Sequence, residues 1–495
     1  MLFLSSDMIK EAERRTMQNV SSMHLIENAA HALFCELKEF NSVRVYCGKG
    51  NNGSDGYATA LLLHKNGIHV EIVQVLPPSS EECILLCEKA LKADIPVSSS
   101  VEFPIEDFDA VLDAVFGIGI SGTIEDANIK KAIDMINSSE SYVISADIPS
   151  GMDADRGIAC GVCVKADKTV TFTAPKRGML SNESVDLCGE IIIAEVGINV
   201  DYTKMEQSTC VPVTRRFVKT LLPKRPRYSH KGTFGSAVIV AGSKSMPGAC
   251  AMAAQAALKS GCGLVKIIAP VSICTVLNIL VKEAIVIPVP EQNGFMLPNL
   301  SQEAVEALEN ADSVLIGCGL GRYPHDALIS KILSMVSCGV IIDADGINAL
   351  RGKIDIIKNK NVLLTPHVLE FSRISGFDVK DIEKKRIQAA DKFARDNGIT
   401  LLLKGARTVV AYGGSNKYIS LDATSALAKA GSGDVLAGAI VSLAAQGMPL
   451  TDAAVAGCYI HCRAGMLAEK KIGPYSAISD DLIKLLPEAI KEIFG

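Results

Sequence analysis

Glycine-rich strings that also carry asparagine or aspartate are the residues of this chain best suited to chemistry. The first of them, Gly48-Lys-Gly50-Asn-Asn-Gly53-Ser-Asp55, follows a strand predicted at 42–47 and precedes a helix expected over 56–66. Glu71 comes about 20 residues later, as in a dinucleotide-binding fingerprint. An aspartate in the turn would repel a pyrophosphate unless a cation or a hydroxyl group accompanied it. The string is therefore better suited to a polar ligand that is held together with a cation.

Two further predicted strands end in an aspartate that is followed by glycine. Asp113 precedes a glycine run at 117–122, and Asp147 precedes the turn Pro149-Ser150-Gly151. Backbone amides in such loops can cradle phosphate, and open α/β sheets bind ligands at the carboxyl ends of their strands. We therefore interpret Asp55, Asp113 and Asp147 as parts of one site rather than as members of three unrelated loops.

A different glycine string, Gly431-Ser-Gly433-Asp434, precedes an apolar helix expected over 435–446. A loop of small residues at a helix N-terminus offers free N–H groups and a positive dipole end to an anion. Asp434 could be an ordinary helix cap. Because the following residues bury the helix, we instead expect its carboxylate at the rim of a phosphate site, where it can remove a proton from a substrate hydroxyl.

Alternating strands and helices must position these strings, which predicts α/β architecture with parallel sheets and helices on both faces. In the first part of the chain the strands are expected at 42–47, 69–76, 110–115, 142–146, 168–172 and 190–195, with helices at 56–66, 81–93 and 128–137. In the second part the strands are expected at 236–241, 264–269, 284–289, 313–316, 340–343, 362–365, 400–404 and 408–411, with long helices at 248–260 and 435–446.

A stretch rich in proline, lysine and arginine separates the two patterns. We expect a first domain at 1–212, a basic connector at 213–231 and a second domain at 232–495. The charge of the connector is explained either by a solvated surface or by contact with substrate phosphates.

Composition and charge exclude several classes of protein. The chain has 495 residues, 48% of them apolar, which is too many for bulk disorder. Its net charge of −5 argues against a nucleic-acid partner. The uncharged run between Asp434 and Asp452 is too short for a membrane span of about 20 residues, so we expect no membrane association.

The cysteines and the N-terminus favour a cytoplasmic protein. There are 15 cysteines, an odd number, and the N-terminus lacks the pattern of a signal peptide, so reduced core thiols are expected. The pairs Cys160/Cys163 and Cys458/Cys462 have no second pair at zinc-ligand spacing.

The strings of the first domain resemble those of the NAD(P)H-hydrate epimerase family. The resemblance runs from Ile26-Glu-Asn-Ala29 through Asp167-Lys-Thr-Val-Thr-Phe172 to about residue 200. It implies a Rossmann-like three-layer domain and a potassium ion held by Asn52, Asp113 and Ser150. Asp147 is our candidate acid/base. The implied substrate contacts are Asn51, Asn52, Gly53, Ser54, Asp55, Gly117, Ile118, Gly119, Ile120, Ser121, Gly122, Thr123 and Asp147.

The second domain resembles the ADP-dependent NAD(P)H-hydrate dehydratases, which have a ribokinase-like α/β fold. The motifs that carry this resemblance are His230-Lys-Gly232, Gly242-Ser243, Gly317-Cys-Gly-Leu-Gly321, Asp343-Ala-Asp345, Thr365-Pro-His367 and Lys404-Gly-Ala-Arg-Thr408. The resemblance implies substrate contacts at Ala249, Gly321, His367 and Asp434. It implies nucleotide contacts at Lys404, Gly405, Ala406, Arg407, Thr408, Thr424, Ser425, Ala426, Leu427, Ala428, Lys429, Ala430, Gly431, Ser432 and Gly433.

Together the two resemblances imply a bifunctional enzyme, an isomerase joined to a lyase, that repairs hydrated NADH and NADPH. The expected cofactors are K⁺ in the first domain and ADP with Mg²⁺ in the second. The expected partners are these small molecules and further copies of the same chain. Two alternatives stay open, a vitamin or sugar kinase fused to a nucleotide-binding domain and a nucleotide sensor without catalysis.

Overall fold

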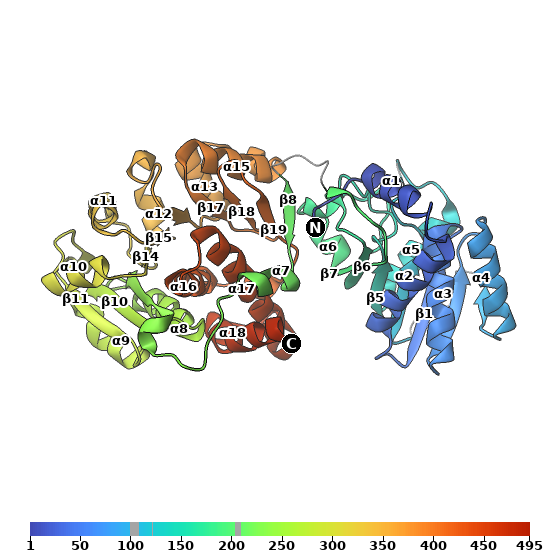
Figure 1. Ribbon diagram of the computed structural model, residues 1–495, viewed down its shortest axis with the longest axis horizontal. Coiled ribbons are helices and arrows are strands. Elements are labelled where there is room, and N and C mark those ends of the chain that lie inside the picture. The colour runs from blue at the N-terminus through green and yellow to red at the C-terminus, as the bar shows by residue number, and fades with distance from the viewer. Residues whose placement is uncertain (100–107, 121, 203–208) are drawn as a thin grey trace. The chain divides into compact units, whose positions relative to one another are not determined.

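The chain divides into two compact units, Met1–Glu206 and Gln207–Gly495 (Figure 1). The computed structural model describes residues 1–99, 108–120, 122–202 and 209–495. The division lies slightly before the boundary expected at residue 212. The reason is the strand β8 (Cys210–Val213), which pairs in parallel with β19 (Lys417–Ser420) of the second unit.

The first unit is built on a parallel sheet whose described strands follow the order β3-β2-β1-β4-β5-β6-β7. Its strands are β1 (Ser42–Cys47), β2 (His69–Gln74), β3 (Val97–Ser98), β4 (Ala110–Ala114), β5 (Tyr142–Ala146), β6 (Lys168–Phe172) and β7 (Glu190–Ala194). Its helices are α1 (Ser6–Thr16), α2 (Ser22–Leu37), α3 (Asn51–Lys65), α4 (Glu81–Lys92), α5 (Ala127–Ser138), the short α6 (Val185–Cys188) and the 3-10 turn η1 (Arg177–Leu180).

Alternate strand residues of this sheet bury two separate faces, as expected for a sheet between two helix layers. Val45 and Leu112 belong to a core cluster with residues of α2, α3 and α4. Tyr46 and Val111, their neighbours along the strands, pack instead with residues of α5. The strand order reverses between β1 and β4, and such a switch point is where open α/β sheets bind ligands.

The second unit holds a larger sheet whose described strands follow the order β11-β10-β9-β14-β15-β16-β17-β18-β19-β8. The strands from β11 to β17 are parallel, and β18 is antiparallel to both of its neighbours. The strands are β9 (Ser236–Val240), β10 (Leu264–Pro270), β11 (Ile285–Val289), β14 (Ser313–Ile316), β15 (Gly339–Ile342), β16 (Val362–Leu364), β17 (Thr400–Leu403) and β18 (Val409–Tyr412), with a separate hairpin of β12 (Glu291–Gln292) and β13 (Phe295–Met296).

The helices of the second unit cover this sheet, and α16 lies at the centre of the core (Figure 1). They are α7 (Arg215–Leu221), α8 (Pro247–Lys259), α9 (Cys274–Leu280), α10 (Gln302–Glu309), α11 (Asp326–Met335), α12 (Asp345–Ala349), α13 (Val368–Ser375), α14 (Val379–Lys384), α15 (Arg386–Asn397), α16 (Ser432–Ala445), α17 (Leu450–Ile472) and α18 (Ser479–Phe494), with the 3-10 turns η3 (Lys231–Phe234), η4 (Val271–Ile273), η5 (Ile354–Ile356) and η6 (Ser425–Leu427). Across the described ranges, none of the helices combines the length and the apolar character needed to cross a bilayer.

The α/β class with parallel sheets is confirmed, and most expected strands are present to within two residues of their expected ends. The stretch expected as a connector differs. Its residues 215–221 form α7, capped by the Thr214 side chain, and Val218 is buried in the core of the second unit.

Candidate active sites

The first glycine string forms the start of α3 rather than a loop. The helix begins at Asn51, five residues before the expected start, and the Ser54 N–H donates to the Gly50 carbonyl at 3.0 Å. A Cβ atom at Gly48 would overlap the carbonyl oxygen of Val115, and one at Gly53 would overlap that of Gly48. Glycine is therefore required where the ends of β1 and β4 and the start of α3 meet.

This close approach brings together residues of three predicted strings. A Cβ atom at Gly117 would lie 3.4 Å from Asp147 Oδ2 and 3.5 Å from Asn52 Oδ1. Asn52 is partly buried, and its buried Nδ2 atom has no hydrogen-bond partner among the described residues. Asn52, Gly117 and Asp147 therefore surround one point at the switch of the sheet.

Asp113 lies behind that point and is completely buried. Its carboxylate accepts hydrogen bonds from the Ser145 hydroxyl and the Ser150 N–H, both at 2.8 Å, and from the Ser150 hydroxyl. Burial raises the pKa of Asp113, while these donors oppose the shift. The Ser150 oxygen also accepts from Phe116 N at 2.9 Å.

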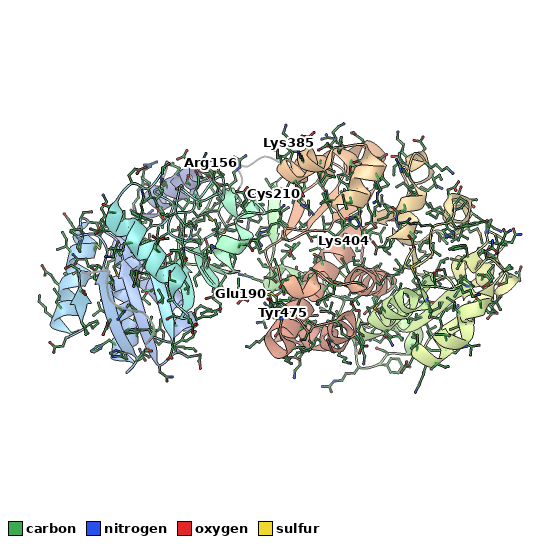
Figure 2. All side chains as sticks on the ribbon, turned by 180° about the vertical axis from the view of Figure 1, so that it is seen from behind. Arg156, Glu190, Cys210, Lys385, Lys404 and Tyr475 are labelled. Atoms are coloured by element: carbon green, nitrogen blue, oxygen red, sulfur yellow. The ribbon has the colours of Figure 1, made fainter. Side chains whose placement is uncertain are left out.

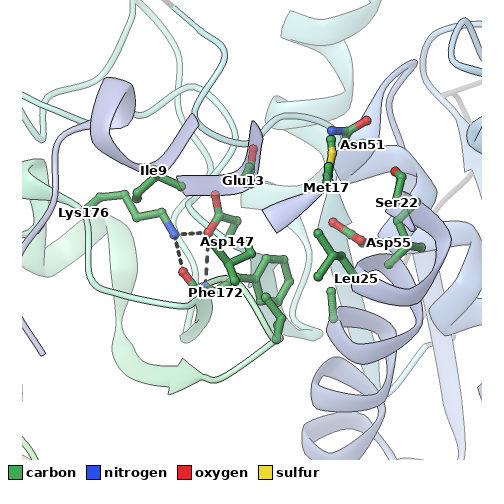
Figure 3. Close-up of a pocket in the computed structure, with 14 residues that line it drawn as sticks. Ile9, Glu13, Met17, Ser22, Leu25, Asn51, Asp55, Asp147, Phe172 and Lys176 are labelled. Carbon is green, nitrogen blue, oxygen red and sulfur yellow. Dashed lines mark hydrogen bonds and ion pairs between the residues drawn. The ribbon is translucent and has the colours of Figure 1, made fainter. Parts of the chain in front are cut away.

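Asp147 is held in an uncommon backbone conformation, with φ 66°. Its Oδ1 atom accepts from Phe172 N at 3.2 Å and from Lys176 Nζ, and the same ammonium donates to the Phe172 carbonyl at 3.1 Å (Figure 3). Lys176 Nζ also donates to Thr171 Oγ1 at 2.8 Å. Lys176 is completely buried. The buried ion pair fixes the position of the Asp147 carboxylate.

Asp147 and Lys176 line a pocket that Asp55 and Asn51 enter from the opposite side (Figure 3). Glu13 of α1 is a third carboxyl group in its lining. Burial, together with the charges of Asp147 and Glu13, raises the pKa of Asp55 well above its ordinary value. Burial and Asp147 also raise the pKa of Glu13.

Other predicted contacts of the first unit lie around this pocket rather than in its lining. Ile118 packs with Leu4 and Ile9, and Ile120 packs against the α5 layer. The methyl group of Thr123 lies beside Gly161, and Gly122 adopts φ 84° in open space. Gly119 donates its N–H to the Gly117 carbonyl at 2.8 Å. Ser121 lies outside the described residues.

Two residues of the pocket, Lys176 and Glu13, were missed in the sequence. Lys176 lies four residues after the end of β6, in Ala174-Pro-Lys176, so a lysine shortly after a strand end was the available signal. Glu13 had no such signal, because it belongs to a helix that carries no motif.

In the second unit, the predicted anion loop is the N-terminus of α16. The helix begins at Ser432, three residues earlier than expected, after Gly431 with φ 87°. A Cβ atom at Gly431 would press on Met252, so this turn also requires glycine. Ser432 and Gly433 thus belong to the first turn, whose N–H groups have no partner within the helix.

Asp434 lies in that first turn, near a buried ion pair. Lys404 Nζ donates to Asp343 Oδ1 at 2.8 Å, and a Cβ atom at Gly433 would lie 3.4 Å from that ammonium. Burial and the charge of Asp343 raise the pKa of Asp434 to about 7, while Cys318 and Lys404 oppose the shift. The carboxyl group can therefore exchange a proton near neutral pH.

A buried histidine forms a hydrogen bond with the same turn. His461 of α17 makes a hydrogen bond of 3.1 Å between its Nε2 atom and the Ser432 hydroxyl. Burial lowers the pKa of His461 to about 4, so the ring is neutral at pH 7. It fixes Ser432 without adding charge to the site.

The predicted substrate contacts of the second unit lie in different surroundings. Gly321 donates its N–H to Asp345 Oδ2 at 2.8 Å, and Ala249 lies beside Gly319. His367 caps α13, where its Nδ1 atom accepts from Leu369 N at 3.1 Å and from Glu370 N at 3.4 Å. Burial and the charge of Lys404 lower the pKa of His367. This histidine thus has a structural role as a cap in addition to the predicted contact.

The two predicted nucleotide stretches lie next to α17. Residues 404–408 connect β17 to β18, and Lys404, labelled in Figure 2, is partly buried. The Arg407 side chain is almost completely buried and donates to the Leu421 carbonyl, so it holds this turn against the segment that precedes the second stretch. The Thr408 hydroxyl donates to the Gly405 carbonyl at 2.8 Å.

The second stretch, 424–433, is fastened to α17 and to the segment before α18. Glu469 accepts from the hydroxyl groups of Thr424 at 2.7 Å and Ser425 at 3.4 Å. Lys429 Nζ donates to the Tyr475 carbonyl at 2.9 Å, and the Ser479 hydroxyl donates to the Ala430 carbonyl at 2.7 Å. Ala426 is buried, and Leu427 packs against the core.

Histidine, cysteine and carboxylate side chains form no group of three suited to a metal ion in the ranges that the structure covers. The Asn52–Asp113–Ser150 set is of another kind, since it offers amide, carboxylate and hydroxyl oxygens.

Comparison with known proteins agrees with both resemblances. Residues 237–488 match the NAD(P)H-hydrate dehydratase family, and residues 22–178 match the family described as YjeF-related protein N-terminus. A ribokinase-like superfamily protein of Enterococcus faecalis has a similar fold, with a TM-score of 0.52 and 23% identity over 59% of this chain and 99% of that chain. The ribokinase-like fold of the second unit is thereby confirmed.

Curated relatives extend over the whole chain. A bifunctional NAD(P)H-hydrate repair enzyme of Moorella thermoacetica is 33% identical over 91% of this chain and 88% of its own length. One of Dictyoglomus turgidum is 31% identical over 100% of this chain and 99% of its own length, and one of Escherichia coli is 32% identical over 90% and 84%. The alternative of a sugar or vitamin kinase is not favoured by these matches. The chain therefore belongs to the family of bifunctional NAD(P)H-hydrate repair enzymes.

Proposed function

We propose that the first unit interconverts the R and S hydrates of NADH and NADPH and that the second returns the S hydrate to NAD(P)H with ADP as phosphoryl donor. The observation that carries this proposal is the position of Asp434 in the first turn of α16, with the Lys404 ammonium close by, where burial raises the pKa of the carboxyl group to about 7. A proton acceptor, a cation and free N–H groups in one place are the parts that phosphoryl transfer to a hydroxyl needs.

In the second unit, Asp434 removes the proton of the ring hydroxyl of the substrate. The hydroxyl oxygen attacks the terminal phosphorus of ADP, and AMP is the leaving group. Lys404 and the N–H groups at 431–433 stabilise the charge on the moving phosphoryl group. Phosphate is a much better leaving group than hydroxide, so the lone pair of the ring nitrogen then expels it. Loss of a proton from the neighbouring carbon restores the dihydropyridine.

Residues of both stretches would hold the nucleotide, as the family resemblance implies. Lys404, at the end of β17, and the turn at 431–433 lie close together, whereas Arg407 serves to hold the 404–408 turn. Mg²⁺ in nucleotide sites is held largely by phosphates and by one or two carboxylates. Asp343 is the buried carboxylate placed to contribute here.

In the first unit, residues 51–55 and 117–123 would bind the hydrate, and Asp147 would exchange protons with it. A potassium ion held by Asn52, Asp113 and Ser150 fits the residues present. Their oxygens are hard ligands, and among the described residues no lysine or arginine is bonded to Asp113. The ion would supply positive charge next to this buried carboxylate.

We further propose that the protein acts in the cytoplasm and as a homo-oligomer. All of its cysteines are free thiols and most are buried, which suits a reducing compartment. Gel filtration with light scattering on the full chain measures the oligomeric state directly, and a mass equal to one chain would contradict the second part of this proposal.

The central experiment supplies mixed R and S hydrates of NADH with ADP, with ATP or with neither, and follows the return of the nicotinamide absorbance. We expect complete recovery with ADP and free phosphate as a product. A stable phosphorylated product formed with stoichiometric nucleotide would indicate a kinase instead, and binding without turnover would indicate a sensor.

The Asp434→Asn variant separates the two activities. We expect it to abolish nucleotide-dependent recovery while epimerisation continues, because the substitution removes the base and leaves the first unit unchanged. Asp381→Asn, at an exposed position of α14, is the matched control and should behave as the original protein. Recovery by Asp434→Asn at the original rate would remove Asp434 from the mechanism.

A further inference from the structure

Two carboxyl groups face one pocket of the first unit from opposite sides, with different surroundings (Figure 3). We infer that Asp55 and Asp147 form an acid–base pair that inverts the hydrate by exchanging its hydroxyl group with water. Asp55 gives a proton to the hydroxyl that leaves, and Asp147 takes a proton from the water that adds on the other face. This inference rests on the proposed epimerase function.

The Asp147 side is built to hold a negative charge. Its carboxylate accepts from the Phe172 N–H and from the Lys176 ammonium, and that ammonium is itself fixed by Thr171 and the Phe172 carbonyl. All of these groups are buried. Donors of this kind stabilise the ionised form of a carboxylate, which is the form that a base needs.

The Asp55 side is built to hold a proton. The residue is only 8% exposed, and its carboxyl group has no hydrogen bond or ion pair with any residue in the described ranges. It lies on α3 across from Asp147, with Glu13 as a further carboxyl group in the same lining. Burial and these two neighbours raise the pKa of Asp55. Two carboxyl groups in one site whose environments differ in this way are typical of a general acid and a general base.

The chemistry of the substrate fits such a pair. The hydrated ring carbon carries a hydroxyl and is bonded to the ring nitrogen. When Asp55 protonates that hydroxyl, the C–O bond breaks, water leaves, and the nitrogen lone pair forms a C=N bond. A second water then adds to the opposite face, its proton passes to Asp147, and the electron pair of the C=N bond returns to nitrogen. No electrons are gained or lost, and each turnover consumes one water and releases one. The proton that Asp147 has gained returns to Asp55 through solvent water before the next turnover.

The test measures oxygen exchange in the full-length protein. The separated R hydrate is incubated with enzyme in water enriched in ¹⁸O, without nucleotide, and the S hydrate that forms is analysed by mass spectrometry, with an enzyme-free sample as background. We expect one solvent oxygen in each S molecule. Epimerisation with the original oxygen retained would overturn the inference, since it would indicate ring opening and closure. No epimerisation at all would instead contradict the proposed function.

Variants test the two carboxyl groups separately. We expect Asp55→Asn to slow epimerisation by about 100-fold or more, the usual worth of a general acid, while the dehydratase activity of the same molecule is retained and reports that the chain is intact. Asp55→Glu should recover part of the rate. Asp134→Asn, an exposed aspartate of α5, is the matched control. An Asp55→Asn protein with the original epimerisation rate would overturn the assignment of the acid.

Lys176 acts in this scheme as a positioning residue for Asp147. We expect Lys176→Gln to lower kcat of epimerisation with little change in KM. Combined with Asp147→Asn it should cost no more than Asp147→Asn alone, because both substitutions disable the same base. Additive losses in the double variant would show that Lys176 acts on the substrate by another route.

Discussion

At the residue scale, the two candidate sites share one arrangement, a lysine–aspartate ion pair next to a second aspartate. In the first unit Lys176 holds Asp147 and leaves Asp55 alone, and in the second Lys404 holds Asp343 beside Asp434. One carboxylate of each set is thus neutralised by a fixed cation. The other aspartate lies outside the ion pair, and burial raises its pKa.

The pH dependence of dehydration should report this arrangement. Asp434 acts as a base only when ionised, and its pKa of about 7 predicts a kcat/KM that falls as the pH drops through 7. Asp343→Asn removes the negative charge that helps to raise this pKa, so the acidic limb should move to lower pH, although the rate itself falls. The measurement is a pH–rate profile of phosphate release between about pH 5.5 and 8.5. A limb that stays in place, or moves to higher pH, would contradict this account of Asp434.

Residue identities were the part of the sites most accessible from the sequence. Asp147 and Asp434 stand beside glycine turns, and the local string alone indicates their position at an element end. Their partners Lys176 and Asp343 are different. The roles of Lys176 and Asp343 in the sites depend on which strands become neighbours. Glu13 reaches the pocket from a helix near the N-terminus. Contacts of that kind follow from the packing of distant segments, which no short string specifies.

At the element scale, the feature that positions Asp434 is the close packing of α16 against α8. Gly438 of α16 lies directly on the backbone of Ala253, where a Cβ atom would overlap the Ala253 carbonyl oxygen. Because helix axes approach this closely only over small residues, the direction of α16, and hence of its N-terminal turn, depends on this glycine.

Substitution of two helical glycines tests that dependence. Gly438→Ala should lower the free energy of unfolding by about 1–3 kcal/mol, the usual cost of overpacking a core. Gly248 lies in the first turn of α8 in open space, so Gly248→Ala, the matched control, should be neutral or raise it by up to about 1 kcal/mol. Chemical denaturation of both variants measures the difference. Equal stability of the two would contradict the packing argument.

The starts of α3 and α16 show why element boundaries were the weaker part of the prediction. Both helices begin inside strings of asparagine, serine and glycine, which are poor helix formers, and both follow a glycine instead of a side chain that caps the helix. Local propensity therefore favours a loop. The helices extend into these strings because their glycines allow close contacts, of Gly53 with the Gly48 backbone for α3 and of Gly431 with the Met252 side chain for α16.

At the scale of the whole molecule, the chain is two units, each with its own core. Residues 210–213 belong to the second unit, since β8 pairs with β19 at the end of its sheet and Val213 is buried in its core. The sequence did not predict this strand. It is short and contains Pro212, which an edge strand tolerates.

Truncation at two positions tests where the second unit begins. A fragment of residues 207–495 should unfold at a higher temperature than one of residues 214–495, because the shorter fragment loses β8 and leaves β19 as an unpaired edge. Each kcal/mol lost corresponds to roughly 2–4 °C in Tm for a protein of about this size. Residues 1–206 and 1–213 form the control pair, which should have equal Tm values. A difference confined to the control pair would place β8 in the first unit.

The N-terminal segment has a practical consequence for anyone who prepares this protein. Leu4 is completely buried and exchanges backbone hydrogen bonds with the residues on either side of Lys176, and α1 then supplies one wall of the pocket. An affinity tag fused ahead of Met1 would disturb the short stretch around Leu4, whose backbone hydrogen bonds set the position of Lys176. A tag after Gly495 is attached to the other unit, so epimerisation rates are best measured on C-terminally tagged protein.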